Sequence, residues 1–171
     1  MRVISAVLLF AFATLAVAQT NPKSEARIAK EVRHELVMLP LLDVFDNLAF
    51  KVDGYNVTLM GQVTRPTLKT DAERAVKNVE GVEHVDNQIE VLPVSPMDDR
   101  LRVRLFRAIY GYTALQRYAM PVIKPIRLIV KNGHVTLEGV VDSEADKNMA
   151  GIRANSVSGV FSVTNNLRVA K

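Results

Sequence analysis

An internal repeat is the feature of this 171-residue sequence that most constrains its fold. Residues 52–91 align with residues 130–169 without a gap, at an offset of 78 residues, and about a third of the aligned positions are identical. The first copy contains VDGYNVTLMGQV and GVEHVDNQIEV, and the second contains VKNGHVTLEGVV and GVFSVTNNLRV. The chain is therefore built from two copies of one small unit.

Each copy begins with the pattern of a β-hairpin. In the first, Val57, Leu59 and Val63 alternate with more polar residues, which is typical of a strand with one buried face. A shorter strand is expected just before it, near residues 48–52, and the second copy repeats both strands. Asn132-Gly133 suits a type I′ turn, whereas Gly54-Tyr55 has glycine first, as a type II′ turn requires.

A helix and a last strand follow each hairpin. Thr64 and Asp142 are candidate helix caps, and Pro66 suits a first helical turn. Gly81 and Gly159 stand where a helix ends in the left-handed conformation.

An amphipathic helix is also expected upstream of each hairpin. The fold class is therefore α+β, with two tandem αββαβ modules, each a small three-stranded sheet packed on two helices. Module 1 covers residues 24–92 and module 2 covers residues 97–171, joined by the proline-rich segment 92–96. Modules of about 70 residues are marginal as independent cores, so we expect the two to pack together.

The repeated motif resembles the BON domain of osmotically inducible periplasmic proteins and envelope lipoproteins. The resemblance lies in Val57-Thr58-Leu59-x-Gly61-x-Val63 and Gly81-Val82-x-x-Val85-x-Asn87-x-Ile89, and in the matching residues 135–141 and 159–167. It implies an αββαβ fold, a periplasmic or envelope location, and association with phospholipid or envelope proteins, without catalysis. The segment before the second hairpin, residues 111–125, is longer than the segment before the first hairpin. The resemblance therefore predicts no conformation for it.

The N-terminus has the features of a secretory signal peptide over residues 1–18. Arg2 is followed by the apolar run Val3–Leu15 and by Ala16-Val17-Ala18, which suits a signal peptidase. The alternative is an uncleaved anchor helix, but the run is shorter than the roughly 20 residues that a span needs. We expect an exported protein, periplasmic or secreted.

No motif in the sequence indicates catalysis, a metal site or a cofactor. Cysteine is absent, and the three histidines occupy unrelated places in the repeat. Asp98-Asp99 is interpreted as a pair that favours the positive end of a helix dipole. Asn87 and Asn165 either reach a ligand or satisfy backbone groups where the chain leaves the sheet, and the second interpretation is favoured.

The positive charge is concentrated in the second half of the chain. Residues 19–96 carry a net charge of −3 and residues 97–171 a net charge of +6. On a helix, Arg100, Arg104 and Arg107 lie within about 60° of one another, opposite the apolar face. Tyr112, Arg117 and Tyr118 follow. Because tyrosine and arginine suit the boundary between headgroups and acyl chains, these six residues are the predicted membrane-binding site.

Three other interpretations of these residues remain. The arginines can form a solvated stripe beside tyrosines that complete a core, or the basic module can dock on the acidic one. The protein can also be an adaptor or chaperone-like module that pairs extended chains with its edge strands. We expect anionic phospholipid or envelope proteins as partners, and neither nucleic acid nor a small-molecule substrate; the sequence does not indicate an oligomeric state.

The Ala-x-Ala site predicts that the exported protein begins at Gln19. Mass spectrometry of the protein recovered after export should give the mass of residues 19–171. A mass that includes Met1 would contradict this prediction and favour the anchor.

Overall fold

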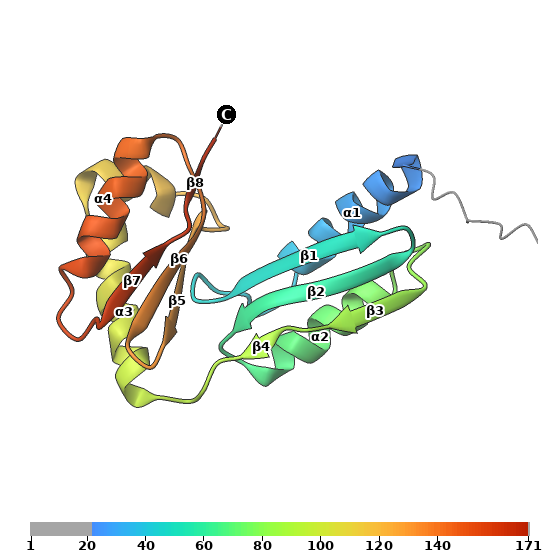
Figure 1. Ribbon diagram of the computed structural model, residues 1–171, viewed down its shortest axis with the longest axis horizontal. Coiled ribbons are helices and arrows are strands. Elements are labelled where there is room, and N and C mark those ends of the chain that lie inside the picture. Colours follow the sequence, from blue (N-terminus) through green and yellow to red (C-terminus); the bar gives the residue numbers. More distant parts are fainter. Residues whose placement is uncertain (1–21, 171) are drawn as a thin grey trace, which may run out of the picture.

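The structure, a computed structural model, describes residues 22–170 and consists of two αββαβ modules, as the repeat predicts (Figure 1). The predicted signal peptide, residues 1–18, lies outside the described residues. Within residues 22–170, no helix is both long and apolar enough to cross a membrane.

The two modules have the same order of elements. Module 1 consists of α1 (Pro22–Val37), β1 (Asn47–Asp53), β2 (Asn56–Val63), α2 (Pro66–Lys77), β3 (His84–Asn87) and β4 (Glu90–Val91). Module 2 consists of α3 (Pro96–Tyr110), the 3-10 helix η1 (Thr113–Ala119), β5 (Ile126–Lys131), β6 (His134–Val141), α4 (Glu144–Asn155), β7 (Ser162–Asn165) and β8 (Arg168–Val169). The predicted last strand is thus split into two short strands in both modules.

The second strand of each module is the central one. In module 1, β2 pairs antiparallel with β1 and parallel with β3 and β4, and β6 has the same neighbours in module 2. Both helices of a module cover one face of its sheet (Figure 1). The alternating residues Val57, Leu59 and Val63 point into this core and are completely buried.

The split of the last strand is held by an asparagine in each module. Asn87 donates from Nδ2 to the carbonyl of Lys69 on α2 at 2.9 Å, and its Oδ1 accepts from the backbone N–H of Ile89 at 3.2 Å. In module 2, Asn165 makes the same two bonds with Lys147 and Leu167, at 2.8 Å and 3.3 Å. The backbone-satisfying interpretation of these asparagines is therefore the right one.

Glycine is required where the central strand passes close to the start of the first strand of the hairpin. Gly61 has a φ of 111° and Gly139 a φ of 123°. A β-carbon at Gly61 would lie 2.0 Å from the carbonyl oxygen of Asn47, and one at Gly139 would lie 1.9 Å from that of Pro125. The recurring Leu-x-Gly is therefore a steric requirement of the fold.

The predicted helix ends are partly right. Gly81 and Gly159 have the predicted left-handed φ values, 87° and 94°, but they lie three residues beyond the C-caps of α2 and α4, Asn78 and Ser156. The Asn132-Gly133 turn has positive φ at both positions. The predicted helix caps are wrong by one residue in both modules. Arg65 is the N-cap of α2 and makes no side-chain cap, whereas Ser143 caps α4 by accepting from the N–H of Asp146. Thr64 instead donates to the buried Asp46 at 2.8 Å.

The two modules pack together through the loop that connects α1 with β1. Val44 in this loop is buried in the core of module 2, and its carbonyl accepts from the N–H of Leu128 on β5 at 2.9 Å. Arg127 donates to the carbonyl of Asp43 at 2.8 Å, and Lys131 pairs with Glu90 across the junction at 2.5 Å. A loop of module 1 thus packs into the core of module 2 and bonds to the outer edge of β5.

We expect Asn165→Ala to destabilise the fold by about 1–3 kcal/mol, because it leaves the Lys147 carbonyl and the Leu167 N–H without their partner. Chemical denaturation followed by circular dichroism measures the change. The matched control is Asn166→Ala, which removes only an exposed contact with Glu138 and should cost a few tenths of a kcal/mol. Equal losses from the two variants would contradict the role of Asn165.

Candidate functional site

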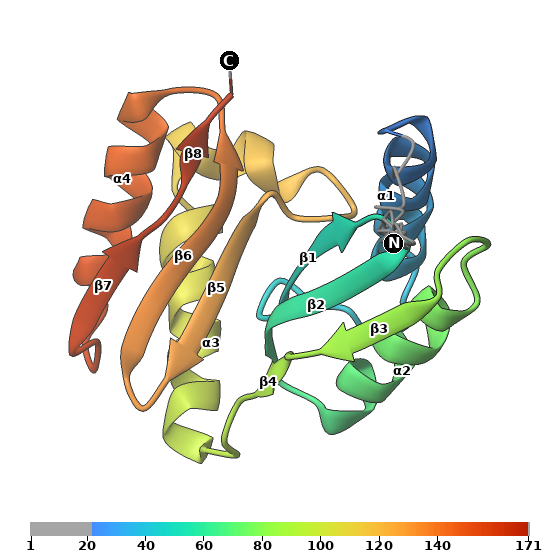
Figure 2. The ribbon, with the colours of Figure 1, turned by 45° about the vertical axis from the view of Figure 1, so that its right-hand side comes forward.

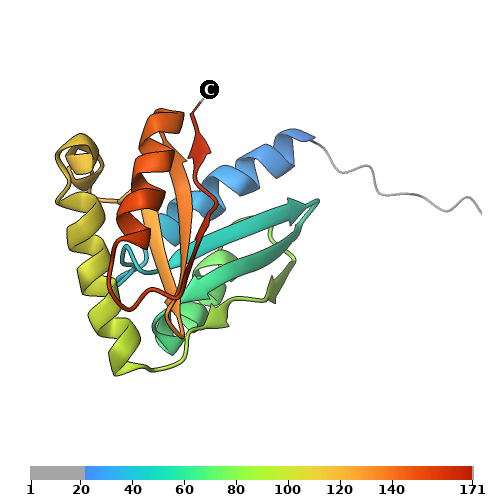
Figure 3. The same cartoon turned by 60° about the vertical axis from the view of Figure 1, so that its left-hand side comes forward.

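Helix α3 carries the predicted basic stripe on a firmly packed helix. Leu101, Leu105 and Ile109 on one side of α3 are buried against the sheet of module 2. Ser95 caps the helix by accepting from the N–H of Asp98, and Pro96 occupies the first turn. α3 and α4 lie on the face of the module 2 sheet that points away from module 1 (Figure 3).

The acidic pair at the start of α3 does more than favour the helix dipole. Asp98 is buried, and its two carboxylate oxygens accept from the N–H groups of Asn132 and Gly133 at 2.8 and 2.9 Å. Asp98 therefore holds the β5–β6 turn against α3. Asp99 pairs with Arg102, a buried arginine that also donates to the carbonyl of Val130 at 2.8 Å. Arg102 thus contributes to the charge of module 2 but not to an exposed basic surface.

Arg100, Arg104 and Arg107 are exposed, as the sequence predicts, with the exposed Val103 between them. Together with Asp99, these four residues line a shallow depression along α3. Within residues 22–170, none of the three arginines forms an ion pair with a carboxylate. The stripe is therefore a row of exposed cations beside the exposed side chain of Val103.

Module 1 neutralises the position that corresponds to Arg104. Arg27 on α1 lies against Gly81 as Arg104 lies against Gly159, with a guanidinium nitrogen 3.1 Å and 3.2 Å from the point that a β-carbon would occupy. Arg27, however, pairs with Glu31 at 3.1 Å and with Glu80 at 3.8 Å. Equivalent basic positions are thus ion-paired in module 1 and unpaired in module 2.

The structure places Arg117 and Tyr118 in an internal polar cluster. Tyr118 is only 5% exposed, accepts from the N–H of Asp142 at 2.8 Å and donates to Asp146 at 3.0 Å. Arg117 stacks on the Tyr118 ring and forms ion pairs with Asp142, at 3.0 Å, and with Asp146. Tyr118 therefore offers no interfacial area, and the charge of Arg117 is already compensated.

The cluster shifts the titration of its members. The Ser143 hydroxyl, which donates to Asp146 at 2.6 Å, lowers the pKa of Asp146, and Tyr118 and Arg117 lower it further. Burial raises the pKa of Tyr118. Hydrogen bonding to Asp142 raises the pKa of Arg117. These shifts are those of a structural ion-pair network that ties η1 to the start of α4.

Tyr112 is half-buried against the core of module 2, with the Arg153 guanidinium 5.1 Å from its ring centroid. It follows the end of α3 at Tyr110 and immediately precedes η1. Of the six predicted site residues, the structure therefore brings together Arg100, Arg104 and Arg107 as one exposed surface and separates Tyr112, Arg117 and Tyr118 from it. Tyr112 and Tyr118 instead pack in or against the core of module 2, which is the alternative interpretation of the tyrosines in the sequence.

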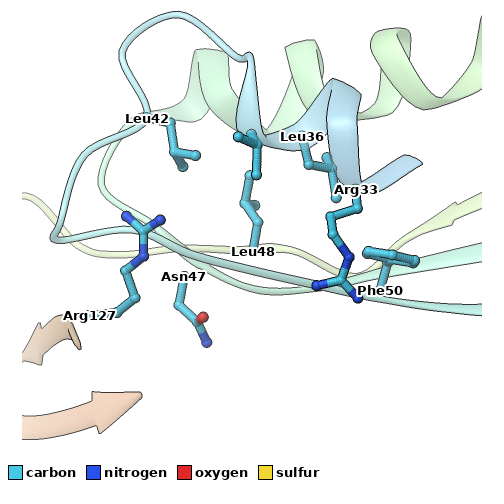
Figure 4. A pocket seen from close by; sticks show the side chains of 8 residues that line it. Arg33, Leu36, Leu42, Asn47, Leu48, Phe50 and Arg127 are labelled. Atoms are coloured by element: carbon cyan, nitrogen blue, oxygen red, sulfur yellow. The ribbon is translucent and has the colours of Figure 1, made fainter. Parts of the chain in front are cut away.

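A small, partly open pocket lies at the junction of the modules. Arg33, Leu36, Leu48 and Phe50 line it from module 1 and Arg127 from module 2 (Figure 4). Its volume is about 120 Å³, against roughly 300–1,000 Å³ for sites that bind small molecules. Among residues 22–170, no cluster of three or more histidine, aspartate or glutamate side chains suits a metal ion.

Comparison with protein families gives two matches to the BON domain, over residues 24–93 and 114–171, which together span well over half of the chain. The chain belongs to the BON-domain family. The second match begins after α3, yet α3 packs in module 2 as α1 packs in module 1, so the structural BON module includes it. The family is generally non-catalytic and is associated with phospholipid and membrane binding.

Solved structures and curated proteins add little to this assignment. The C-terminal domain of CdsD, a structural protein of the type III secretion system of Chlamydia trachomatis, is 13% identical over 83% of this chain and 96% of its own, with a TM-score of 0.31. A second structure of CdsD is also 13% identical, over 85% and 94% of the two chains, with a TM-score of 0.30. No curated protein matches.

We expect Asp146→Asn to destabilise the BON protein by about 1–3 kcal/mol at pH 7, because the ionised carboxylate accepts bonds from Ser143, Tyr118 and Arg117. The folded-state pKa of Asp146 is lowered, so this contribution is complete above the unfolded pKa of about 3.9 and is lost as the pH falls through the folded value. Thermal unfolding should therefore show a difference at pH 7 that shrinks below about pH 4.

The matched control is Asp142→Asn, since Asp142 also pairs with Arg117 but is exposed. It should change stability by less than about 1 kcal/mol. A difference for Asp146→Asn that stays constant from neutral to acidic pH would contradict the role of its charge.

Proposed function

We propose that this BON protein is an exported, non-catalytic protein that binds membrane surfaces containing anionic phospholipid through module 2. The binding residues are Arg100, Arg104 and Arg107 on the outer face of α3. The association of the family with membranes supports the class of partner, and the signal-like N-terminus supports an envelope location.

The observation that carries the proposal is the lack of ion-pair partners for the three arginines within the described chain. A membrane surface with negative headgroups supplies many acceptors to a row of guanidinium groups, and arginine binds phosphate in a planar, bidentate manner. The equivalent Arg27 of module 1 is compensated by Glu31 and Glu80. Module 2 is therefore the better candidate for the membrane-facing half.

The expected affinity is modest and reversible. A basic side chain near an anionic leaflet gains about 1 kcal/mol. Three arginines therefore supply about 3 kcal/mol, which corresponds to roughly a hundredfold in partition. Such binding is strongly sensitive to salt, because exposed charges are screened over about 8 Å at physiological ionic strength.

The protein-adaptor alternative would use an exposed edge strand. The outer edge of β5 is already engaged at Leu128, whose N–H donates to Val44 of module 1. This contact leaves less of that edge for an extended partner chain.

We expect Arg100→Gln, Arg104→Gln and Arg107→Gln together to weaken binding to vesicles of phosphatidylglycerol and phosphatidylcholine by about tenfold to a hundredfold at low salt. The loss should shrink as salt rises. Glutamine has good helix propensity, so folding should change little. Flotation of the protein with vesicles at two salt concentrations measures both effects.

The control triple variant replaces Lys69, Arg74 and Lys77 of α2 with glutamine. Arg74 and Lys77 are paired with Asp71 and Glu73, so their removal should have little effect on vesicle binding. Equal losses from both triple variants would indicate diffuse charge without a site. Unchanged binding in both would contradict the lipid proposal and favour the adaptor.

A further inference from the structure

Two corresponding loops of the modules carry large apolar side chains into solvent. Each loop follows the first helix of its module and leads to the hairpin. In module 1 the exposed residues are Met38 (65%) and Leu41 (61%), and in module 2 they are Met120 (84%), Val122 (97%) and Ile123 (41%). Isolated exposed apolar residues are common on proteins, but a cluster of them in two corresponding loops is typical of an interaction surface.

Packing of the modules brings these two loops side by side. Leu39 and Leu42 of module 1 and Val122 and Ile123 of module 2 line the same surface cleft, which is also lined by Phe106 of α3. In Figure 2, the gold segment that precedes β5 reaches toward α1. The apolar surface therefore belongs to the tandem and is not present in either module alone.

The conformation of the loop in module 1 is unusual. Leu41 has a φ of 68°, in the left-handed region that a residue with a β-carbon rarely adopts. The strained residue is a leucine whose side chain is largely exposed, so burial of that side chain does not offset the strain. Backbone strain of this kind concentrates at sites of function.

The groups around the apolar loops are mainly basic. Lys124 and Arg127 line the cleft, and Arg33 lies beside the neighbouring pocket. The acidic group lining the cleft is Asp43, whose Oδ1 accepts from the N–H of Val44. Apolar loops with cations in the cleft between them match a bilayer surface, where acyl chains lie beneath anionic headgroups.

The apolar loops are also continuous with the arginine stripe. Phe106, which lines the cleft, and Val103, which lies among the arginines, are three residues apart and therefore neighbours on α3. Arg107 neighbours Val103 at a spacing of four residues. A membrane that contacts the C-terminal end of the stripe can thus also reach the loop of module 2.

We infer that residues 38–41 and 120–123 together form a bilayer-insertion surface, in which Met38, Leu41, Met120 and Val122 enter the boundary between headgroups and acyl chains. The inference rests on the proposed lipid binding and adds to it an apolar contact that requires both modules. The arginines attract the protein to the surface, and the loops determine which end of the molecule enters it.

Single-tryptophan variants test the insertion directly, because the sequence contains no tryptophan. Met38→Trp and Val122→Trp place a probe in each loop, and Tyr55→Trp is the matched control in the β1–β2 turn, at the end of module 1 far from module 2 (Figure 1). On vesicles of phosphatidylglycerol and phosphatidylcholine, both loop probes should shift to shorter emission wavelength and be quenched by lipids brominated on the acyl chain. The control should show neither change.

The outcomes separate the two proposals. If the vesicles bind the protein but neither loop probe is quenched, the insertion surface is wrong and the arginine site stands. Quenching at residue 122 alone overturns the joint surface. If no variant binds vesicles, the proposed function itself fails, and capture of a protein partner by the same loops becomes the explanation to test.

Flotation of a loop variant gives a second, independent measurement. Met38→Ser and Val122→Ser together remove apolar area from exposed positions, so the fold should be retained, and vesicle binding should fall by about tenfold with little dependence on salt. A loss that disappears at high salt would contradict insertion, because it would show that these positions act only through the charges nearby.

Discussion

Each module depends on the hydrogen bonds of one asparagine. Its side chain joins the second helix to the point where the last strand is split in two. The amide of Asn87 or Asn165 bonds to a helix carbonyl on one side and to the strand backbone two residues ahead on the other. Between these contacts, the N–H of Gln88 or Asn166 bonds to the central strand. The chain therefore changes direction without leaving its backbone groups unpaired, and the buried residues before and after the break can both face the core.

Local patterns predicted most of the fold. The alternation around Val57 and Leu59, the turn residues Asn132-Gly133 and the glycines 81 and 159 report conformations that depend on near neighbours, and all are found in the structure. The helix caps were misplaced because Thr64 has a partner, Asp46, that is distant in the sequence. The short helix η1 and the burial of Val44 depend on contacts between elements or between modules, which no single-segment pattern contains.

The same distinction between local and long-range contacts explains which parts of the candidate site were predicted. The exposure of Arg100, Arg104 and Arg107 follows from helical geometry opposite an apolar face, which the sequence contains. The environment of Tyr118 depends on Asp142 and Asp146, which are more than twenty residues away. Composition alone could not distinguish a tyrosine at a membrane boundary from one whose hydroxyl completes a buried cluster. The apolar loops were missed because their significance appears only when the modules are joined.

The position of Val44 has a consequence for how the halves of this chain relate to each other. Val44 belongs to module 1 in sequence, but it is buried in the core of module 2 and bonds to the outer edge of β5. A fragment that contains only module 2 would expose the apolar surface that Val44 covers. The N–H of Leu128 would also lose its acceptor, the carbonyl of Val44. The two copies are thus similar in sequence but unequal in packing, because module 2 takes a core residue from module 1.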